Sequence, residues 1–171
     1  MNPGDVPPRR RLGEILIERG KLDAAALDRA LRLQQESGGE RLGQLLVTLG
    51  VCAQRDVTEA LADQLGLPLV DAAVYPEFPI LEEQVSPRFL RESRALPVRE
   101  DEAELALAMA DPTDAYTIGA FEMVTGRAVR PMVAIPTELD TALERLYGAG
   151  KSALGQIVGE GGERDELAFD A

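Results

Sequence analysis

The chain of 171 residues carries a net charge of −12 and contains one Cys, no His and no Trp. This length allows one domain or two small ones, and the composition excludes a disulfide framework and a Cys/His zinc site. An acidic chain is also a poor match for nucleic acid or an anionic membrane surface.

The sequence contains no apolar run approaching the roughly 18 residues of a membrane span, and no apolar signal segment at its start. We therefore expect a cytoplasmic protein without direct membrane insertion. The charge is uneven: residues 1–66 hold 9 Lys or Arg and 10 Asp or Glu, whereas residues 67–171 hold 9 and 20. A phosphate-bearing ligand would therefore be tolerated by the first part of the chain and repelled elsewhere.

Residues 1–10 contain three Pro and a Gly before a basic pair, a composition typical of a disordered leader. The stretch that follows recurs 30 positions later. Aligning residues 11–34 with residues 41–64 gives eight identical positions among 24. A fixed period of this size indicates one supersecondary unit used twice.

Each copy of the repeat predicts a short helix, a tight turn and a second helix. In the first copy Gly20 supplies the backbone freedom that ends the first helix, and Asp23 is placed to cap the second. The second helix carries an apolar stripe that ends in an amide, at Leu27, Leu31 and Gln34. Neither copy can bury its stripe alone, so we expect the two to pack together with these Leu side chains in the core. Cys52 aligns with an apolar position and is expected to be a small buried filler.

Three features recur in both copies and differ from ordinary packing. Arg11 and Arg41 begin apolar helices, and Gly13 and Gly43 lie in helical turns, where Gly costs roughly 1 kcal/mol relative to Ala. Arg can stack on planar rings or grip phosphate, Gln can pair with polar edges, and Gly lets another group approach the backbone. From the residues alone, two hairpins with solvated Arg and Gln ends are the simpler interpretation. A doubled, anionic ligand is the alternative.

The tandem pattern R-L-G-x-x-L-x-x-x-G-x6-L-x3-L-x2-Q resembles the MshEN-type cyclic-di-GMP-binding domain. That domain lies at the N-terminus of type II secretion and type IV pilus assembly ATPases. The resemblance implies that one cyclic-di-GMP lies across both motifs, and it favours the ligand over the simpler interpretation. Val57 stands where the family has Leu. The implied ligand-binding residues are Arg11, Leu12, Gly13, Leu16, Gly20, Leu27, Leu31, Gln34, Arg41, Leu42, Gly43, Leu46, Gly50, Val57, Leu61 and Gln64.

The remaining chain predicts a small α/β subdomain. Gly66 with Pro68 ends the second repeat, and residues 71–79 form a linker. The order expected over residues 80–148 is two short helical pieces and then β-β-α-β-α. The second helical piece runs from Pro87 to Arg94 with Ser86 as its cap. The strands are expected at residues 96–98, 105–110 and 129–135, the third at an edge because of Pro131, and the helices begin at Thr113 or Asp114 and at Pro136.

The fold class is therefore α+β. A bundle of two helical-hairpin repeats (11–70) precedes a three-stranded subdomain (80–148), and residues 149–171 form a flexible acidic tail or linker. Residues 148–152, GAGKS, look like the end of a phosphate-binding loop, but they follow a helix and Arg145 stands where that pattern needs Gly. The carboxylate clusters at residues 82–83 and 100–102 are expected to be a solvated face and a polar turn.

The predicted function is that of a cyclic-di-GMP-binding regulatory and docking module of a type II secretion ATPase, without the motor. The resemblance implies docking to the cytoplasmic domain of a membrane protein called the L component, which would place the chain beside the inner membrane. Arg88 and Arg91 are candidate docking residues. No catalysis, cofactor or metal is expected. The alternatives are an adaptor that binds the L component without nucleotide and, least favoured, an enzyme that uses residues 148–152.

Overall fold

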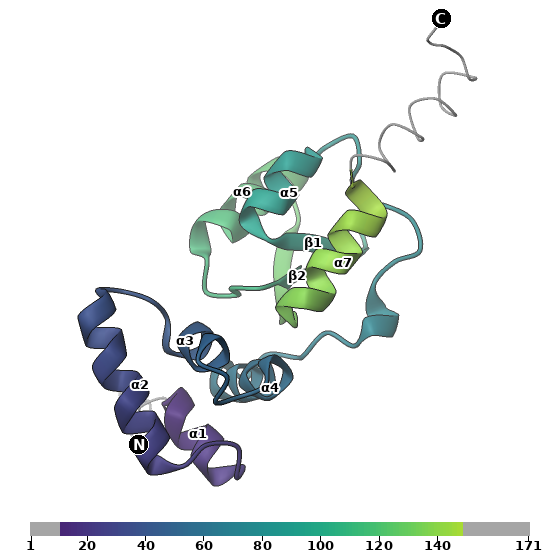
Figure 1. The fold of residues 1–171 in the computed structure, drawn as a ribbon. Helices are drawn as coiled ribbons and strands as arrows, with labels where there is room; N and C mark the ends of the chain where they lie inside the picture. Colours follow the sequence, from purple (N-terminus) through teal and green to yellow (C-terminus); the bar gives the residue numbers. More distant parts are fainter. Residues whose placement is uncertain (1–10, 149–171) are drawn as a thin grey trace, which may run out of the picture. The chain divides into compact units, whose positions relative to one another are not determined.

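The computed structural model describes residues 11–148, which fall into two compact units divided between Leu69 and Val70. We call residues 11–69 the helical unit and residues 70–148 the sheet unit (Figure 1). Helices and one three-stranded sheet make the fold α+β, as predicted. Within residues 11–148, no helix has the length and apolar character needed to cross a membrane. The predicted leader, tail and GAGKS segment lie outside the described residues, except for Gly148.

The helical unit contains four helices whose bounds follow the period of the sequence. They are α1 (Leu12–Glu18), α2 (Ala24–Ser37), α3 (Leu42–Thr48) and α4 (Gln54–Leu65). Gly20 and Gly50 follow the first helix of each copy with φ of 73° and 74°, in the left-handed region that favours glycine. The Asp23 carboxylate accepts a hydrogen bond from the Ala26 amide at 2.7 Å, which confirms the predicted cap.

The first helix of each copy packs against the second helix of the other copy. α1 packs on α4, and α2 packs on α3, so exchanging the two copies maps this pair of contacts onto itself. The core is formed by small and branched side chains, among which Leu16, Ala30, Leu46 and Ala60 are fully buried. Cys52 is buried as predicted, and burial followed by the nearby Asp56 carboxylate raises the pKa of its thiol.

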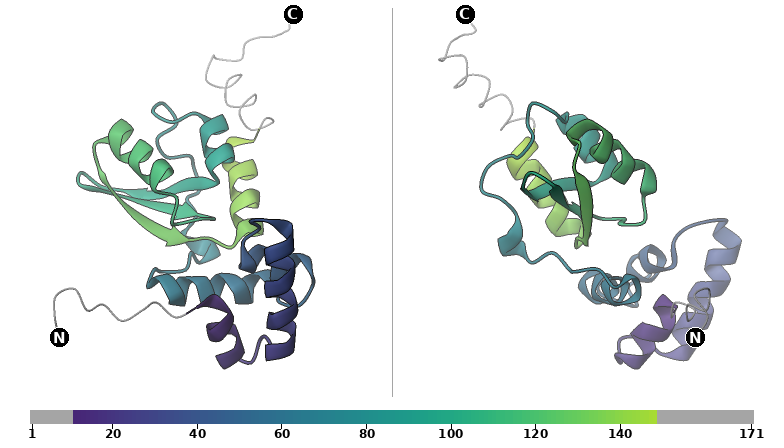
Figure 2. Two further views of the ribbon diagram at one scale, coloured as in Figure 1. Left: turned by 90° about the vertical axis from the view of Figure 1, so that its left-hand side faces the viewer. Right: turned by 180° about the vertical axis from the view of Figure 1, so that it is seen from behind.

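The sheet unit surrounds a three-stranded sheet with helices (Figures 1 and 2). Its elements are η1 (Ala72–Val74), α5 (Pro87–Ser93), β1 (Ala95–Glu100), β2 (Glu104–Met109), α6 (Ala115–Thr125), β3 (Ala128–Val133) and α7 (Pro136–Tyr147). β1 and β2 pair antiparallel, whereas β3 pairs parallel to β2 after the α6 crossover. The sheet order β1-β2-β3 places β3 at an edge, so the predicted β-β-α-β-α order and the edge strand are confirmed.

The central strand β2 is buried on both faces, because Leu105 and Leu107 alternate with Ala106 and Ala108 and all four are buried. Ser86 caps α5 and Asp114 caps α6, as predicted. The helical piece predicted before Pro87 is wrong: residues 81–84 form turns, and Leu81 has a φ of 64°.

Candidate ligand-binding site

The two motif arginines lie at equivalent places, directly before α1 and α3, and both are exposed. The backbone amide of Arg11 donates a hydrogen bond to the Glu14 carboxylate at 3.0 Å, which fixes the start of α1. Each arginine therefore stands at the surface on a defined helix end. Such a position leaves a guanidinium accessible to a planar ring or a phosphate.

The two motif glycines lie against side chains of the second helix of the same copy. A Cβ at Gly13 would lie 2.8 and 2.9 Å from the two δ carbons of Leu27. A Cβ at Gly43 would lie 2.9 Å from Cγ1 of Val57 and 3.3 Å from Cδ2 of Leu12. The close approach that these glycines permit is therefore made by a helix of the protein itself.

Other motif positions belong to the core or to the turns. Leu16 and Leu46 are fully buried, and Leu12 and Leu42 are half-buried against the same core. The fold thus explains the identity of five of the eight matching positions, namely Leu12/Leu42, Gly13/Gly43, Leu16/Leu46, Gly20/Gly50 and Ala30/Ala60.

The end of each motif lies at the border between the buried face and solvent. Leu31 is 37% exposed, so the expectation that it belongs to the core is wrong. The buried positions of α2 are Ala26 and Ala30. Gln34 is half-buried and donates from Nε2 to the carbonyl of Glu40 at 3.1 Å. In the second copy Leu61 and Gln64 are also half-buried.

Three identical pairs therefore remain that neither the core nor the turns explain: Arg11/Arg41, Leu31/Leu61 and Gln34/Gln64. All six side chains are partly or largely exposed. Together they offer positive charge, apolar surface and amide groups, which are the groups that a nucleotide ligand needs.

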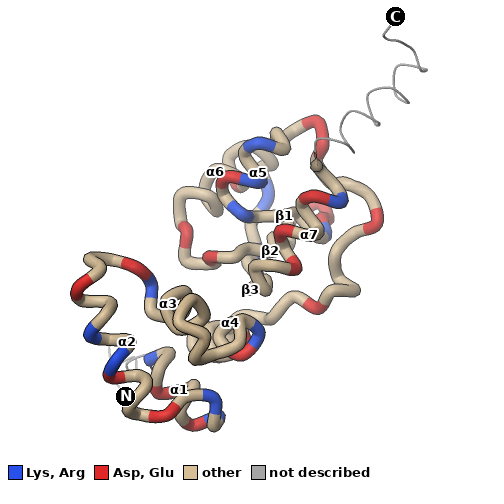
Figure 3. Tube along the Cα trace, in the orientation of Figure 1, with Lys and Arg blue, Asp and Glu red and all other residues tan. Residues whose placement is uncertain are grey.

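Charges near the two motifs are unevenly placed (Figure 3). α3 contains no charged residue, whereas the contact of α1 with α4 is bordered by ion pairs. Arg19 lies 3.3 Å from Asp63, and Lys21 lies 3.7 Å from Asp56. These acidic side chains of α4 are paired with bases and leave less negative charge to repel a phosphate.

The carboxylate cluster at residues 100–102 forms a polar turn. Asp101 accepts hydrogen bonds from the amides of Glu104 and Ala103, both at 2.8 Å, and these bonds lower the pKa of its carboxyl. Glu100 pairs with Arg127 at 3.1 Å. The described residues contain no group of three or more Cys, Asp or Glu side chains arranged to hold a metal ion.

The arginines near α5 make contacts within the sheet unit. Arg91 donates to the carbonyl of Tyr147 at 2.7 Å, and Arg94 pairs with Asp140 at 2.8 Å, so both tie the α5 region to α7. Arg88 pairs with Glu92 one helical turn away at 3.1 Å.

Sequence reasoning overlooked a pocket in the sheet unit that involves Tyr75 and α7. The only local signal was an aromatic residue between Pro-rich positions, within a segment interpreted as a linker.

The fold and the repeated motif together define the class of protein. It is a two-unit α+β protein with a tandem surface motif on its helical unit. The chain belongs to the MshEN domain family, because the model of that family matches residues 65–153. This match covers the sheet unit and leaves the tandem motif almost untouched. It therefore shows the family without testing the site.

Similar proteins extend the comparison across both units. The chain is 43% identical over 152 residues to type II secretion system protein E of Xanthomonas campestris pv. campestris, covering 86% of this chain and 27% of that protein. The N-terminal domain of XpsE is 41% identical with a TM-score of 0.66, covering 81% and 94% of the two chains. A structure of MshE with cyclic-di-GMP is 29% identical with a TM-score of 0.66, covering 81% and 100%. The chain spans about a quarter of the length of the curated relatives it matches.

Proposed function

We propose that the helical unit binds one cyclic-di-GMP across its two motifs. The observation that carries this proposal is the set of three identical pairs, partly or largely exposed, that the fold does not require: Arg11/Arg41, Leu31/Leu61 and Gln34/Gln64. A second support is the likeness to MshE, which was solved with cyclic-di-GMP.

Each exposed pair has a role suited to its chemistry. Arg11 and Arg41 stack on guanine or hydrogen-bond to phosphate, because a guanidinium is planar and permanently charged. Leu31 and Leu61 cover the apolar faces of base and ribose. The amides of Gln34 and Gln64 pair with polar edges, and Gln34 exchanges its bond to Glu40 for one to the ligand.

The buried motif residues act indirectly in this proposal. Gly13 and Gly43 allow the second helix of each copy to lie close to the first, which sets the spacing between the arginine and the Leu and Gln positions. Leu16, Leu46, Leu27 and Val57 hold that spacing by packing. Substitutions there would weaken binding through the shape of the site.

Regulation follows from the doubled site. A ligand that touches both copies favours one arrangement of the repeats, and the change is limited by its differential affinity for the two arrangements.

We propose that the chain is the regulatory and docking module of a type II secretion ATPase. It would dock to the cytoplasmic domain of the L component and lie in the cytoplasm beside the inner membrane. Catalysis would belong to the motor of the parent ATPase.

The test is calorimetry with cyclic-di-GMP on wild type, Arg11→Ala and Arg41→Ala. Loss of a charge-assisted contact should weaken binding roughly tenfold or more in each variant. Arg29→Ala is the matched control, because Arg29 is exposed on α2 outside the motif. Unchanged affinity in both motif variants with an intact fold would remove these arginines from the site.

The second candidate function is an adaptor that binds the L component without nucleotide. Tyr116 and Met123 of α6, 80% and 85% exposed, provide apolar surface for a protein partner. Co-purification with the L component, together with no heat from any cyclic dinucleotide, would favour the adaptor.

A further inference from the structure

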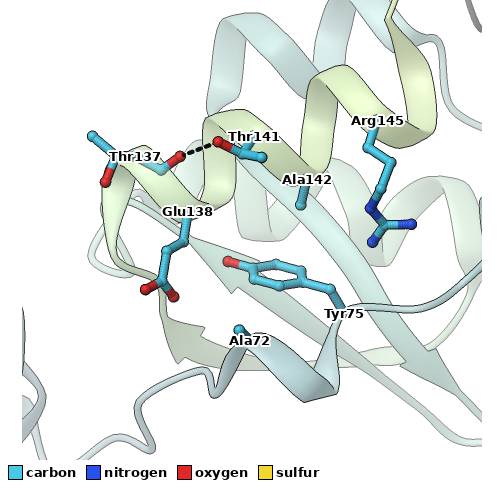
Figure 4. Close-up of a pocket in the computed structure, with 7 residues that line it drawn as sticks. All are labelled: Ala72, Tyr75, Thr137, Glu138, Thr141, Ala142 and Arg145. Atoms are coloured by element: carbon cyan, nitrogen blue, oxygen red, sulfur yellow. Dashed lines mark hydrogen bonds between the residues drawn. The ribbon is translucent and has the colours of Figure 1, made fainter.

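The sheet unit carries surface features that the motif does not involve. One is a pocket of about 320 Å³ between η1 and α7, shown in Figure 4. Polar groups of this pocket are engaged within the unit: the Thr141 hydroxyl donates to the Thr137 carbonyl at 2.9 Å, and Arg145 donates to the Pro76 carbonyl at 3.1 Å. Another feature is the outward side of α6, where large apolar side chains are exposed.

α6 carries apolar residues on both its inward and its outward side. The inward side packs on β3 and toward α5, where the ring centroids of Phe121 and Phe89 lie 5.5 Å apart. On the outward side Tyr116 is 80% exposed, Met123 85% and Val124 53%. A helix that is apolar on all sides is normally buried on all sides, so we expect another surface to cover the outward side of α6.

Gly119 lies between Tyr116 and Met123 on the outward side of α6. A Cβ at Gly119 would have no heavy atom within 4 Å, in contrast to Gly13 and Gly43, which face side chains of the protein itself. A glycine inside a helix is less stable than alanine, and here neither packing nor a turn of the chain requires it. Close approach by a second backbone from outside would explain this glycine.

The outward side of α6 is uncharged, although the sheet unit is strongly acidic. Residues 70–148 hold 7 Arg and 15 Asp or Glu, which leaves a net charge of −8. The charged residue of α6 is Glu122, and its carboxylate accepts a hydrogen bond from the Val129 amide of β3 at 3.1 Å. Two molecules of this chain would repel each other at acidic surfaces, whereas the outward sides of two α6 helices can meet without like charges.

We propose that α6 is a contact between two molecules of this chain, paired antiparallel about a twofold axis that passes between Gly119 and Ala120. In this register Tyr116 of one molecule faces Met123 of the partner subunit, and the same contact recurs on the other side of the axis. The thioether packs on the Tyr ring, a favourable sulfur–aromatic contact. The small residues at the axis let the two helices approach closely.

The size of this contact predicts a weak dimer. An aromatic side chain buries about 150–250 Å², so two Tyr, two Met and the small residues between them give roughly 600–1,000 Å² in total. Stable interfaces bury about 1,200–2,000 Å², and smaller ones are transient. The contact would strengthen wherever other parts of a longer parent protein hold two molecules together, because tethering raises their effective concentration.

The full chain is its own probe in the first test. Sedimentation equilibrium over roughly 10 µM to 1 mM should show reversible dimerisation. Tyr116→Glu and Met123→Glu should each weaken it roughly tenfold or more, because like charges then meet at the contact. Phe78→Glu is the matched control, since Phe78 is 70% exposed outside α6, and it should leave dimerisation unchanged. A monomer at the highest concentration, or equal effects of all three substitutions, would overturn the proposal.

Gly119→Leu separates close approach from general apolar attraction. A Cβ at this position meets no neighbour in the free protein and leucine favours a helix over glycine, so the melting temperature of the monomer should not fall. At the twofold axis the larger side chain would hold the helices apart, so dimerisation should weaken roughly tenfold or more. Stronger dimerisation, which added apolar surface alone would produce, would refute the close contact at Gly119.

Cross-linking tests the antiparallel register. Tyr116→Cys and Met123→Cys are prepared in a Cys52→Ala background, which removes the native cysteine, and are treated with a short bis-maleimide alone and as a mixture. Antiparallel pairing predicts faster cross-linking in the mixture than in either variant alone. Faster cross-linking of each variant with itself would indicate parallel pairing and overturn the register.

The adaptor alternative places a different protein on the same helix, and the same variants distinguish the two. If the chain stays monomeric while Tyr116→Glu abolishes co-purification with the L component, α6 belongs to that partner and the contact between two molecules of this chain is wrong. Dimerisation that competes with co-purification would support the contact. Neither result depends on whether the helical unit binds cyclic-di-GMP.

Discussion

Gly43→Ala tests why the motif contains glycine. The new methyl would lie 2.9 Å from Cγ1 of Val57 and 3.3 Å from Cδ2 of Leu12. Ala gains at most about 1 kcal/mol in helix propensity, whereas overpacking costs about 1–3 kcal/mol. Val57 cannot easily turn away, because a valine in a helix has one strongly preferred rotamer. We therefore expect a net loss of about 1 kcal/mol in the free energy of unfolding.

The matched background is Val57→Ala, which removes the atom that the new methyl would meet. There, Gly43→Ala should be neutral or slightly stabilising, so the two substitutions should be coupled by about 1–2 kcal/mol. Gly13→Ala should cost less than Gly43→Ala. Its nearest atoms are the δ carbons of Leu27, at the end of a flexible side chain that is only half-buried.

The assay is urea unfolding followed by far-ultraviolet circular dichroism, with peptide-resolved hydrogen exchange over α3 and α4. Tyrosine fluorescence is unsuitable because Trp is absent and all three Tyr, at positions 75, 116 and 147, lie in the sheet unit. Equal effects of Gly43→Ala in both backgrounds would refute the packing explanation. Loss of cyclic-di-GMP binding at unchanged stability would instead assign the glycine to direct contact with the ligand.

Three further substitutions or titrations test the core. Leu31→Ala should cost only about 1–1.5 kcal/mol because Leu31 is 37% exposed, against about 2–5 kcal/mol for the fully buried Leu46→Ala; equal urea midpoints would contradict this. Tyr147→Phe should destabilise the sheet unit by about 1–3 kcal/mol, since the Ile80 amide and carbonyl lose their partner. Tyrosine fluorescence during urea unfolding measures this loss of stability, and an unfolding midpoint equal to that of wild type would contradict the prediction. Burial raises the pKa of Tyr75 and Tyr147 from 10.0 to about 12, so the stability they contribute is full below pH 10 and is lost as the pH rises toward 12. A urea midpoint independent of pH in that window would disprove the shift.

The sequence predicted the elements wherever local chemistry sets the boundary. Gly20 and Gly50 adopt the left-handed conformation that their turns need, and Asp23 and Asp114 cap helices with side chains that can do so only locally. The edge position of β3 followed from Pro131, which lacks an amide donor.

Predictions failed where the outcome depends on packing. The apolar stripe of α2 was centred on Leu27 and Leu31, but the buried centre is Ala26 and Ala30, since small residues let neighbouring helices approach closely. Residues 81–84 carry helical spacing yet form turns, and a short segment gains too little from helix formation to resist such a bend.

The pocket and the role of the glycines required the structure for the same reason. Tyr75 meets α7 more than 60 positions along the chain, and no local pattern encodes that contact. Gly13 and Gly43 were interpreted as openings toward a ligand, whereas the nearest atoms belong to Leu27 and Val57. The pairs Arg11/Arg41 and Gln34/Gln64 were identifiable from the period alone, but their function stays a prediction.

The repeats meet at two helix contacts, α1 with α4 and α2 with α3, which we call the two seams. The seams differ in chemistry, and this difference predicts how salt acts on ligand binding. At the α1–α4 seam, Arg19 lies 3.3 Å from Asp63; the equivalent positions at the α2–α3 seam are Leu49 and Leu33. The ion pair is partly exposed, so it contributes about 0–1 kcal/mol and weakens as salt is added.

If cyclic-di-GMP tightens the α1–α4 seam, wild type should lose more affinity between low and high salt than the double variant Arg19→Leu/Asp63→Leu. The phosphates of the ligand contribute the same salt dependence to both proteins, so the difference between the two slopes isolates the seam. Calorimetry at several salt concentrations measures both slopes. Parallel slopes would show that binding leaves this seam unchanged, and that any regulatory movement lies elsewhere in the helical unit.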